Sequence, residues 1–275
     1  MHSIIDACYG QNLGLEEYRT DSEIVSLVLK GEGELDGWKS QLTTWQMRVY
    51  DSPLTSQDLE KMKVEDKIME RFFIVLSVRY HNLQILLHRP ILEKFLEDCG
   101  GQSSSRTRGG GNRGMMQQLG INSIETCVNS AVLAVSIVRT VVLSNGWHRD
   151  LLGAWNFSLF YSKSPKQLIV FFGAMRIEYL TLLLIAFNAG LVIFAAMHIA
   201  RNEVNNDPKQ VSRWEFVENA LPYFSMAIEA LQNLDQGNRV VERCVSYLSQ
   251  LRVVSITSCE CISCGVTILF ITLVD

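Results

Sequence analysis

The chain has 275 residues, of which 48% are hydrophobic and 20% are charged. This composition is typical of a globular protein and excludes disorder over most of the length. The formal net charge is −4 and the pI is near 5.8. Because compact nucleic-acid-binding domains carry an excess of basic residues, direct DNA contact by most of this chain is not expected.

Seven cysteines are present, an odd number, and Cys8, Cys99, Cys127 and Cys244 stand alone within helical patterns. This distribution predicts buried free thiols in a reducing compartment rather than a disulfide framework. The first residues lack the basic region and the apolar stretch of a signal peptide, so we expect an intracellular protein.

The first part of the chain predicts two short helices. Residues 21–30 and 37–48 show apolar residues at helical spacing. Asp, Ser and Pro at 51–53 break the pattern, and we expect Thr55 or Ser56 to cap the helix that follows.

The strongest predicted helix spans residues 64–87. Its apolar side chains recur every three or four residues and fall on one stripe, which comprises Ile68, Phe72, Val75, Leu76, Leu83 and Leu87. Pro90 is expected to end or kink this helix, and a short helix over 91–98 to follow. The run GGQSSSRTRGGGNRG at 100–114 has too few apolar residues to offset the entropy of ordering, and predicts a flexible loop.

Three further helices are predicted over residues 122–143, 215–234 and 239–253, the last two separated by a turn at 235–238. The sequence shows no strand-like alternation of useful length and no internal repeat. The predicted fold class is therefore all-α, a large helical module.

Residues 179–199 have the length and apolar composition of a membrane span, and Arg201 supplies a basic flank. Asn188 lies near the middle of this stretch and His198 near its end. Taken alone, the segment fits a transmembrane helix and a buried helix equally. A single-span membrane protein with helical flanks is therefore the alternative interpretation of the chain.

His81 and His88 are seven residues apart on the long predicted helix, so they could share a face and bind a metal or transfer protons. No partner pattern such as HExxH accompanies them. We favour a hydrogen-bonded network that anchors the helix.

Three cysteines near the end of the sequence, Cys259, Cys261 and Cys264, resemble half of a zinc site. A tetrahedral zinc site needs four ligands, and no second pair lies nearby. The arginines of 100–114 could contact phosphate but lack a strand–loop–helix context. Neither GxSxG nor GxxxxGK[ST] occurs. We expect no enzyme and no cofactor in this chain, and keep a helical enzyme or metal protein as a third interpretation.

Four stretches together resemble one family. The most specific is Arg79-Tyr80-His81-Asn82 leading into Leu86-Leu87-His88-Arg89-Pro90. The others are CYGQNLG at 8–14, GAWNFSLFY at 153–161, and LDQGN at 234–238 followed by Arg243-Cys244 and Tyr247-Leu248. Their order and separations are similar to the middle homology region of fungal-specific binuclear zinc-cluster transcription factors, xylanolytic-activator type. The similarity covers most of residues 1–161 and 187–253.

This resemblance implies a helical module that regulates a nuclear transcription factor, by restraining activation or responding to an effector. In that family a separate N-terminal cluster of six cysteines holds two zinc ions and binds DNA. The sequence contains no such cluster, so zinc is expected only in that missing part. The implied partners are DNA through the missing cluster, the transcription machinery or co-regulators, a small-molecule effector and a second copy of the chain.

The same resemblance implies structural rather than catalytic roles for the motif residues. The expected anchors of the helical core are Arg79, Tyr80, His81, His88, Arg89, Pro90, Trp155 and Phe157.

One departure from the family pattern falls at residues 162–186, because the family continues almost directly from Tyr161 to a run like that starting at Phe187. The codons of this interval can spell a 5′ splice site, a branch point and an acceptor. Excision of 72 nucleotides, the length of 24 codons, would keep the frame and join Tyr161 to Phe187 through one Thr. We hypothesise that residues 163–185 are a translated intron.

A second donor site can be encoded at Val254-Ser255. Residues 254–275 are therefore interpreted as a read-through tail. The predicted organisation is a regulatory region over 1–253, with a flexible loop at 100–114 and an insertion at 162–186, followed by this tail.

Overall fold

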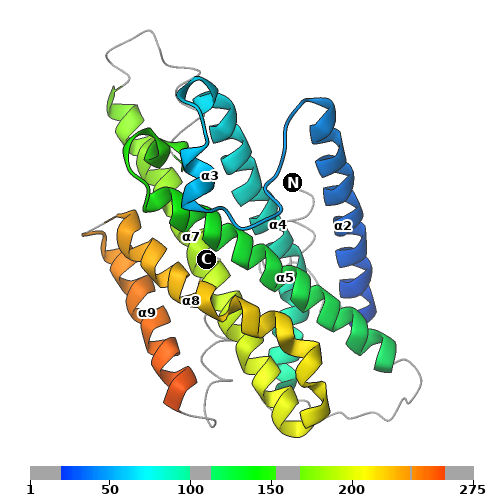
Figure 1. Cartoon of the computed structure of the whole chain (residues 1–275). Helices are drawn as coiled ribbons and strands as arrows, with labels where there is room; N and C mark the ends of the chain where they lie inside the picture. The colour runs from blue at the N-terminus through cyan, green and yellow to red at the C-terminus, as the bar shows by residue number, and fades with distance from the viewer. Residues whose placement is uncertain (1–19, 100–112, 153–167, 236, 258–275) are drawn as a thin grey trace.

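Helices account for most of the residues that the computed structural model describes, which are 20–99, 113–152, 168–235 and 237–257 (Figure 1). These ranges contain no strand, so the all-α prediction is confirmed. In chain order the elements are α2 (Asp21–Thr44), α3 (Ser56–Glu60), η2 (Val64–Asp66), α4 (Lys67–Cys99), α5 (Arg113–Val142), η3 (Gly146–Leu152), α7 (Leu168–Asn206), η5 (Pro208–Trp214), α8 (Glu215–Leu234) and α9 (Arg239–Thr257).

Capping residues explain where α2 and α3 begin. The Thr20 hydroxyl accepts the backbone N–H of Glu23, and the Glu23 carboxylate accepts the Thr20 N–H at 2.7 Å. Thr55 and Asp58 form the same reciprocal pair at the start of α3. Each pair satisfies backbone donors that the first helical turn leaves without a partner. The predicted cap at Thr55 is confirmed.

The last two helices follow the prediction closely. α8 has the predicted bounds, and its apolar residues fall on one buried face. The chain then turns through Gly237, whose φ of +90° is a conformation that glycine adopts without steric cost. α9 begins at the predicted residue and extends four residues further, to Thr257.

The prediction of two helices in 21–48 is wrong, because α2 continues through Gly31, Gly33 and Gly37. Each glycine costs about 1 kcal/mol in a helix relative to alanine. Burial of Val28 before the glycines, Leu35 among them and Leu42 after them offsets that cost in the cluster shared with α4.

Pro90 is predicted to end or kink the helix, with a separate short helix over 91–98. The end at Pro90 and the separate helix are wrong, since α4 runs unbroken from Lys67 to Cys99. Proline removes one backbone donor from a helix interior. Leu87 before it and Leu92 after it are at most 1% exposed. Packing on both sides therefore holds the helix together where the local sequence does not.

The bounds of α5 differ from the predicted loop at 100–114 and from the predicted helix at 122–143. This helix already begins at Arg113, so the last two residues of the predicted loop are helical. It ends at Val142, one residue short of the predicted end. Residues 100–112 lie outside the described ranges.

The predicted apolar stripe of α4 is correct in its second half only. Leu83 and Leu87 are buried, whereas Ile68 is 68% exposed. In the first half the buried side chains are instead Phe73 and Ile74. Periodicity identifies a helical stripe, but the neighbours of α4 differ along its length and decide which side is covered.

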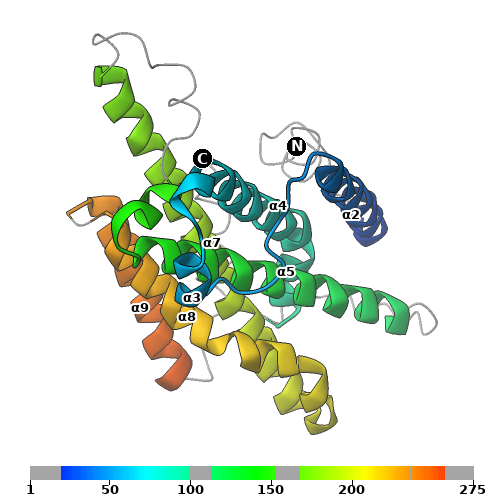
Figure 2. The same ribbon diagram turned by 45° about the horizontal axis from the view of Figure 1, so that its top comes forward.

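The core lies around α5, which packs against α4, α7 and α8 (Figures 1 and 2). α9 lies on the outer side of α8 and also contacts α7. A second, smaller cluster joins α2 to the opposite side of α4; its buried members are Val28, Leu35, Leu42, Val49, Tyr80, Leu83, Leu87 and Ile91.

Two described helices are long and apolar enough to cross a membrane, by length and composition only. They span Gln118–Val142 and Thr181–Asn206, with mean hydropathy of 1.5 and 2.2. Within the structure, 67% and 83% of their most apolar windows are buried by other parts of the chain. Burial against neighbouring helices accounts for this apolar composition as well as a bilayer would.

The hypothesised insertion overlaps α7. Leu182, Leu183, Ile185 and Ala186 are buried, while Leu184 is 42% exposed. The intron hypothesis remains a prediction about the transcript. Four residues of the hypothesised tail, 254–257, belong to α9, and the rest of 254–275 lies outside the described ranges.

Candidate functional site

Four polar side chains lie in a row along one face of helix α4. They are Ser77, His81, Gln84 and His88, and their spacing of four, three and four residues keeps them in line along a helix. Ser77 and His88 are fully buried and His81 is 2% exposed. We call this row the polar seam. Ser77 and His81 bond to the segment between α2 and α3, and Gln84 and His88 bond to α5.

The first two members of the polar seam hold the backbone of Tyr50, which lies in the segment between α2 and α3. The Tyr50 N–H donates to Ser77 Oγ at 2.8 Å, and the Tyr50 carbonyl accepts from His81 Nε2 at 2.8 Å. Both backbone groups of Tyr50 are therefore satisfied by side chains of α4.

Helix α5 holds the same segment four residues further on. The Leu54 N–H donates to Ser136 Oγ at 3.2 Å, and Thr140 Oγ1 donates to the Leu54 carbonyl at 2.8 Å. Leu54 itself is buried. Two core helices thus fix the segment 50–54 by side-chain hydrogen bonds at both of its ends.

The protonation of His81 follows from its partner. A carbonyl oxygen can only accept, so Nε2 of His81 carries the proton that Tyr50 accepts. Burial lowers the pKa of His81, against a smaller opposing effect of the bond to Tyr50. His81 is therefore a neutral donor within the core.

Gln84 links α4 to α5 and to the side of the helix that faces α2. Its carbonyl accepts from Ser130 Oγ at 2.7 Å, and its amide donates to the Tyr80 hydroxyl at 3.1 Å. The Tyr80 ring stacks on Trp38 of α2 at 6.1 Å between centroids. Burial, together with nearby carboxylates, raises the pKa of Tyr80 to about 12.

His88 lies where α2, α4 and α5 meet. Its Nδ1 is 2.6 Å from Ser123 Oγ on α5, and its Nε2 is 3.3 Å from a carboxylate oxygen of Glu32 on α2 without forming a hydrogen bond. Burial lowers the pKa of His88 to about 4, so the ring is neutral near pH 7. A neutral imidazole needs no counter-charge, and the Glu32 side chain is 35% exposed to solvent.

Of the remaining predicted anchors, three lie on α4 and two lie outside the described residues. Arg89 is buried and donates from Nε to Glu93 at 2.8 Å, an ion pair one turn apart. Burial raises the pKa of the Glu93 carboxyl, and the Arg89 charge opposes that shift. Arg79 and Pro90 are half-buried on α4. Trp155 and Phe157 lie outside the described residues.

The polar seam is buried, so its side chains contact other parts of the chain and not a substrate. Ser123 and His88 resemble a nucleophile and its base, but Ser123 is 6% exposed and His88 is not exposed, so a substrate cannot reach them. Among the described residues, no three His, Cys, Asp or Glu side chains lie close enough together to hold a metal ion. Cys127 is fully buried beside the seam, and burial raises the pKa of its thiol to about 12. That thiol is therefore a poor nucleophile.

The sequence predicted the histidines as members of a network but missed Ser77, Gln84, Ser123 and Ser130. Ser77 and Gln84 could have been predicted from the sequence, because they are polar and lie at helical spacing from the histidines, on the same face of the helix. The serines of α5 carried no such signal, because their partners lie 35 to 46 residues away along the chain.

Comparison with known proteins gives relatives in fungi. The chain is 26% identical over 246 residues to "Transcription factor FBD3" of Gibberella moniliformis and 25% identical over 243 residues to the protein of the same name in Fusarium pseudograminearum. The chain is similar to fungal transcription factors. Each alignment covers 88% of this chain but 27% of the relative, so the chain spans about a quarter of the length of these proteins. No family model matches the chain, and no solved structure matches it.

Proposed function

We propose that this chain is the helical regulatory region of a fungal transcription factor and that it acts through contacts with other proteins. The observation that carries the proposal is the similarity to two fungal transcription factors over 88% of the chain. The motif that includes Arg79, His81 and His88 supports it, because its side chains lie on a helix whose polar contacts join α2, α4 and α5.

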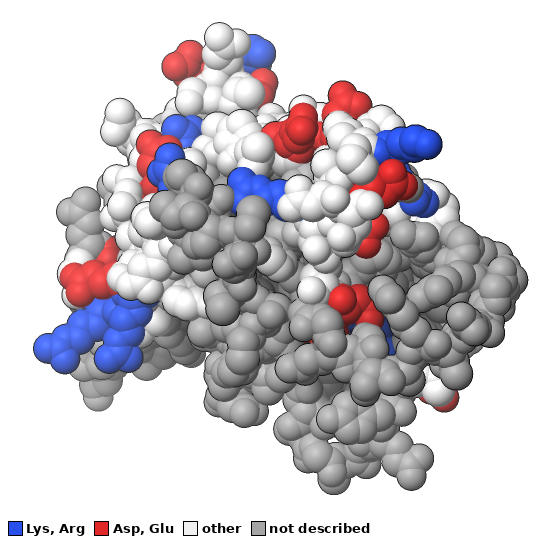
Figure 3. All heavy atoms as spheres, turned by 90° about the horizontal axis from the view of Figure 1, so that it is seen from below, with Lys and Arg blue, Asp and Glu red and all other residues white. Residues whose placement is uncertain are grey.

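The charge of the chain favours protein contacts over DNA contacts. The formal net charge is −4. Acidic and basic side chains are interspersed over the described part of the face drawn in Figure 3. Binding to the DNA backbone needs a basic surface. DNA contact, zinc and nuclear location then belong to the whole transcription factor, while co-regulators, an effector or a second copy contact this region.

A reporter assay tests the proposal. The whole chain is fused to a DNA-binding domain of another protein, and transcription is measured from a promoter that carries the matching site. We expect a change of about threefold or more relative to the DNA-binding domain alone, in either direction. Ile137→Asp, which places a charge at a fully buried position of α5, serves as the inactive control. Equal transcription from the fusion and the DNA-binding domain alone would overturn the proposal.

A fractionation experiment decides between this function and a membrane protein anchored by α7. The apolar helix Thr181–Asn206 is the feature that favours the alternative. If the chain is a regulatory region, carbonate extraction of cells that express it should release the chain into the supernatant, because the other helices bury α7. Retention of the chain in the membrane pellet would favour the alternative instead.

A further inference from the structure

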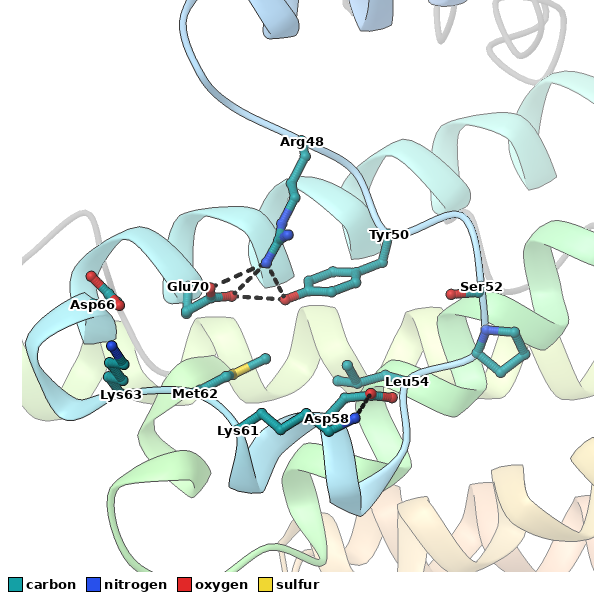
Figure 4. Close-up of a pocket in the computed structure, with 11 residues that line it drawn as sticks. Arg48, Tyr50, Ser52, Leu54, Asp58, Lys61, Met62, Lys63, Asp66 and Glu70 are labelled. Atoms are coloured by element: carbon teal, nitrogen blue, oxygen red, sulfur yellow. Dashed lines mark hydrogen bonds and ion pairs between the residues drawn. The ribbon is translucent and has the colours of Figure 1, made fainter.

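A pocket of about 450 Å³ opens beside the segment that the polar seam holds in place (Figure 4). One wall consists of Arg48, Tyr50 and Glu70, and the opposite wall is the short helix α3 with the residues that follow it. Met62 and Leu54 lie between the two walls. The volume is within the range of small-molecule sites in proteins.

The first wall is held together by contacts among its three polar groups. The Tyr50 hydroxyl donates to Glu70 at 2.7 Å, and Arg48 Nη2 lies 3.2 Å from the same carboxylate. The guanidinium also lies 5.2 Å from the Tyr50 ring centroid and 5.0 Å from that of Phe73. Burial and the Glu70 carboxylate raise the pKa of Tyr50, so its hydroxyl stays a donor.

The opposite wall also has internal contacts. Asp58 accepts from Thr55 at the start of α3 and pairs with Lys61 at 3.5 Å. Bonds from Thr55 lower the pKa of the Asp58 carboxyl. Contacts within the chain therefore define both walls of the pocket.

Two of the charged side chains that line the pocket have no partner of their own. Within the described part of the chain, the side chains of Lys63 and Asp66 make no hydrogen bond or ion pair. All the hydrogen bonds of Arg48 start from Nη2, so the other guanidinium nitrogens have capacity to donate. The groups left to bind a ligand are thus the Lys63 ammonium, the Asp66 carboxylate and the Arg48 nitrogens that do not bond to Glu70. They lie beside the apolar side chain of Met62.

We propose that this pocket binds a free amino acid with an apolar side chain. Its carboxylate would be held by Lys63 and by the free donors of Arg48, and its ammonium group by Asp66. Its side chain would lie against Met62 and the small exposed part of Leu54. The pocket lining carries three cationic and three anionic residues, and this balance fits a zwitterion better than an anion or a cation. The inference extends the proposed function by giving the effector a chemical class, but binding itself does not depend on a role in transcription.

Calorimetric titration of the purified whole chain with leucine, methionine, valine and phenylalanine tests the proposal. We expect at least one of them to bind. N-acetyl-leucine and leucinamide serve as probes that lack the ammonium and the carboxylate charge. Each should bind about tenfold more weakly than leucine, or more weakly still, the loss expected for one charge-assisted hydrogen bond. No binding by any of the four amino acids at about 10 mM would overturn the proposal.

Two exposed substitutions locate the site. Lys63→Gln and Asp66→Asn should each weaken binding about tenfold. Lys30→Gln and Glu34→Gln, at exposed positions of α2 that do not line the pocket, should leave binding unchanged. Circular dichroism confirms that each variant is folded. Equal binding of leucine and N-acetyl-leucine, or binding unaffected by both pocket substitutions, would refute this site, whatever the reporter assay gives.

Discussion

The buried imidazole of His88 makes the stability of this fold depend on pH in a specific direction. Its pKa is about 4 in the folded chain, against an ordinary value of 6.5. The folded state keeps the ring neutral, whereas the unfolded state takes up a proton below pH 6.5. The free energy of unfolding is therefore unaffected by His88 above pH 6.5, and it decreases as the pH falls from 6.5 to 4.

The size of the loss follows from these two pKa values. At pH 5 the unfolded state gains about 2 kcal/mol relative to the folded state, and below pH 4 about 3 kcal/mol. Because His88 is fully buried, solvent does not screen this effect. Two polar side chains face the ring, Glu32 from α2 and Ser123 from α5. Burial, with Asp36 nearby, raises the pKa of Glu32, and a raised carboxyl pKa acts in the opposite direction, adding stability as the pH falls.

Urea unfolding of the wild type, His88→Gln and Glu32→Gln at pH 8 and pH 5 separates these contributions. The free energy of unfolding of His88→Gln should fall by about 2 kcal/mol less than that of the wild type between the two pH values. Glu32→Gln should keep the loss, because burial and not Glu32 lowers the pKa of His88. An equal fall in the wild type and His88→Gln would refute the assignment of a neutral, buried His88.

Three further predictions concern other parts of the chain. Gly33→Ala should raise the free energy of unfolding by about 0.5–1 kcal/mol, since a Cβ there meets no atom within 4 Å. Gly31→Ala, whose Cβ would lie 2.6 Å from Leu87 Cδ1, should lose about 1–3 kcal/mol relative to it, and equal values by urea unfolding would show that α2 does not dock on α4. Phe157→Ala should cost about 3–5 kcal/mol if the residue is an anchor, so a stability within about 1 kcal/mol of wild type would remove it from the core. Sequencing of the transcript across codons 155–195 should show most molecules without 72 nucleotides, and full-length transcripts alone would contradict the intron hypothesis.

The sequence predicted the helices whose boundaries depend on local signals. α8 has the expected bounds because its amphipathic pattern, and the turn after it, lie within a few residues of its ends. α2 and α4 were each divided wrongly, at glycines and at Pro90, because contacts between these two helices override local propensity. Such contacts join residues distant in sequence, and the periodicity of one segment does not contain them.

The candidate site was predictable to the same degree. His81 and His88 were expected to form a hydrogen-bonded network, and in the structure each makes one hydrogen bond, to Tyr50 and to Ser123. Their partners Tyr50 and Ser123 lie 31 and 35 residues away along the chain, so helix packing and not spacing selects them. The pocket was missed for the same reason, since its walls meet only when the segment 48–63 folds back on α4.

Tyr50 belongs to both the pocket and the polar seam, and this double role gives a way to separate them. Its hydroxyl bonds to Glu70 in the pocket wall, while its backbone bonds to Ser77 and His81 in the seam. Tyr50→Phe removes the hydroxyl's contacts with Glu70 and Arg48 and leaves the backbone bonds of the seam in place. We therefore expect weaker amino-acid binding with a change in unfolding free energy of about 1 kcal/mol. His81→Leu instead breaks the seam contact and leaves the Tyr50 carbonyl without its donor, and should cost about 1–3 kcal/mol in stability. If both variants changed binding and stability in the same proportion, the pocket wall and the seam would form one cooperative unit, and a ligand at Arg48 would act directly on the packing of α4.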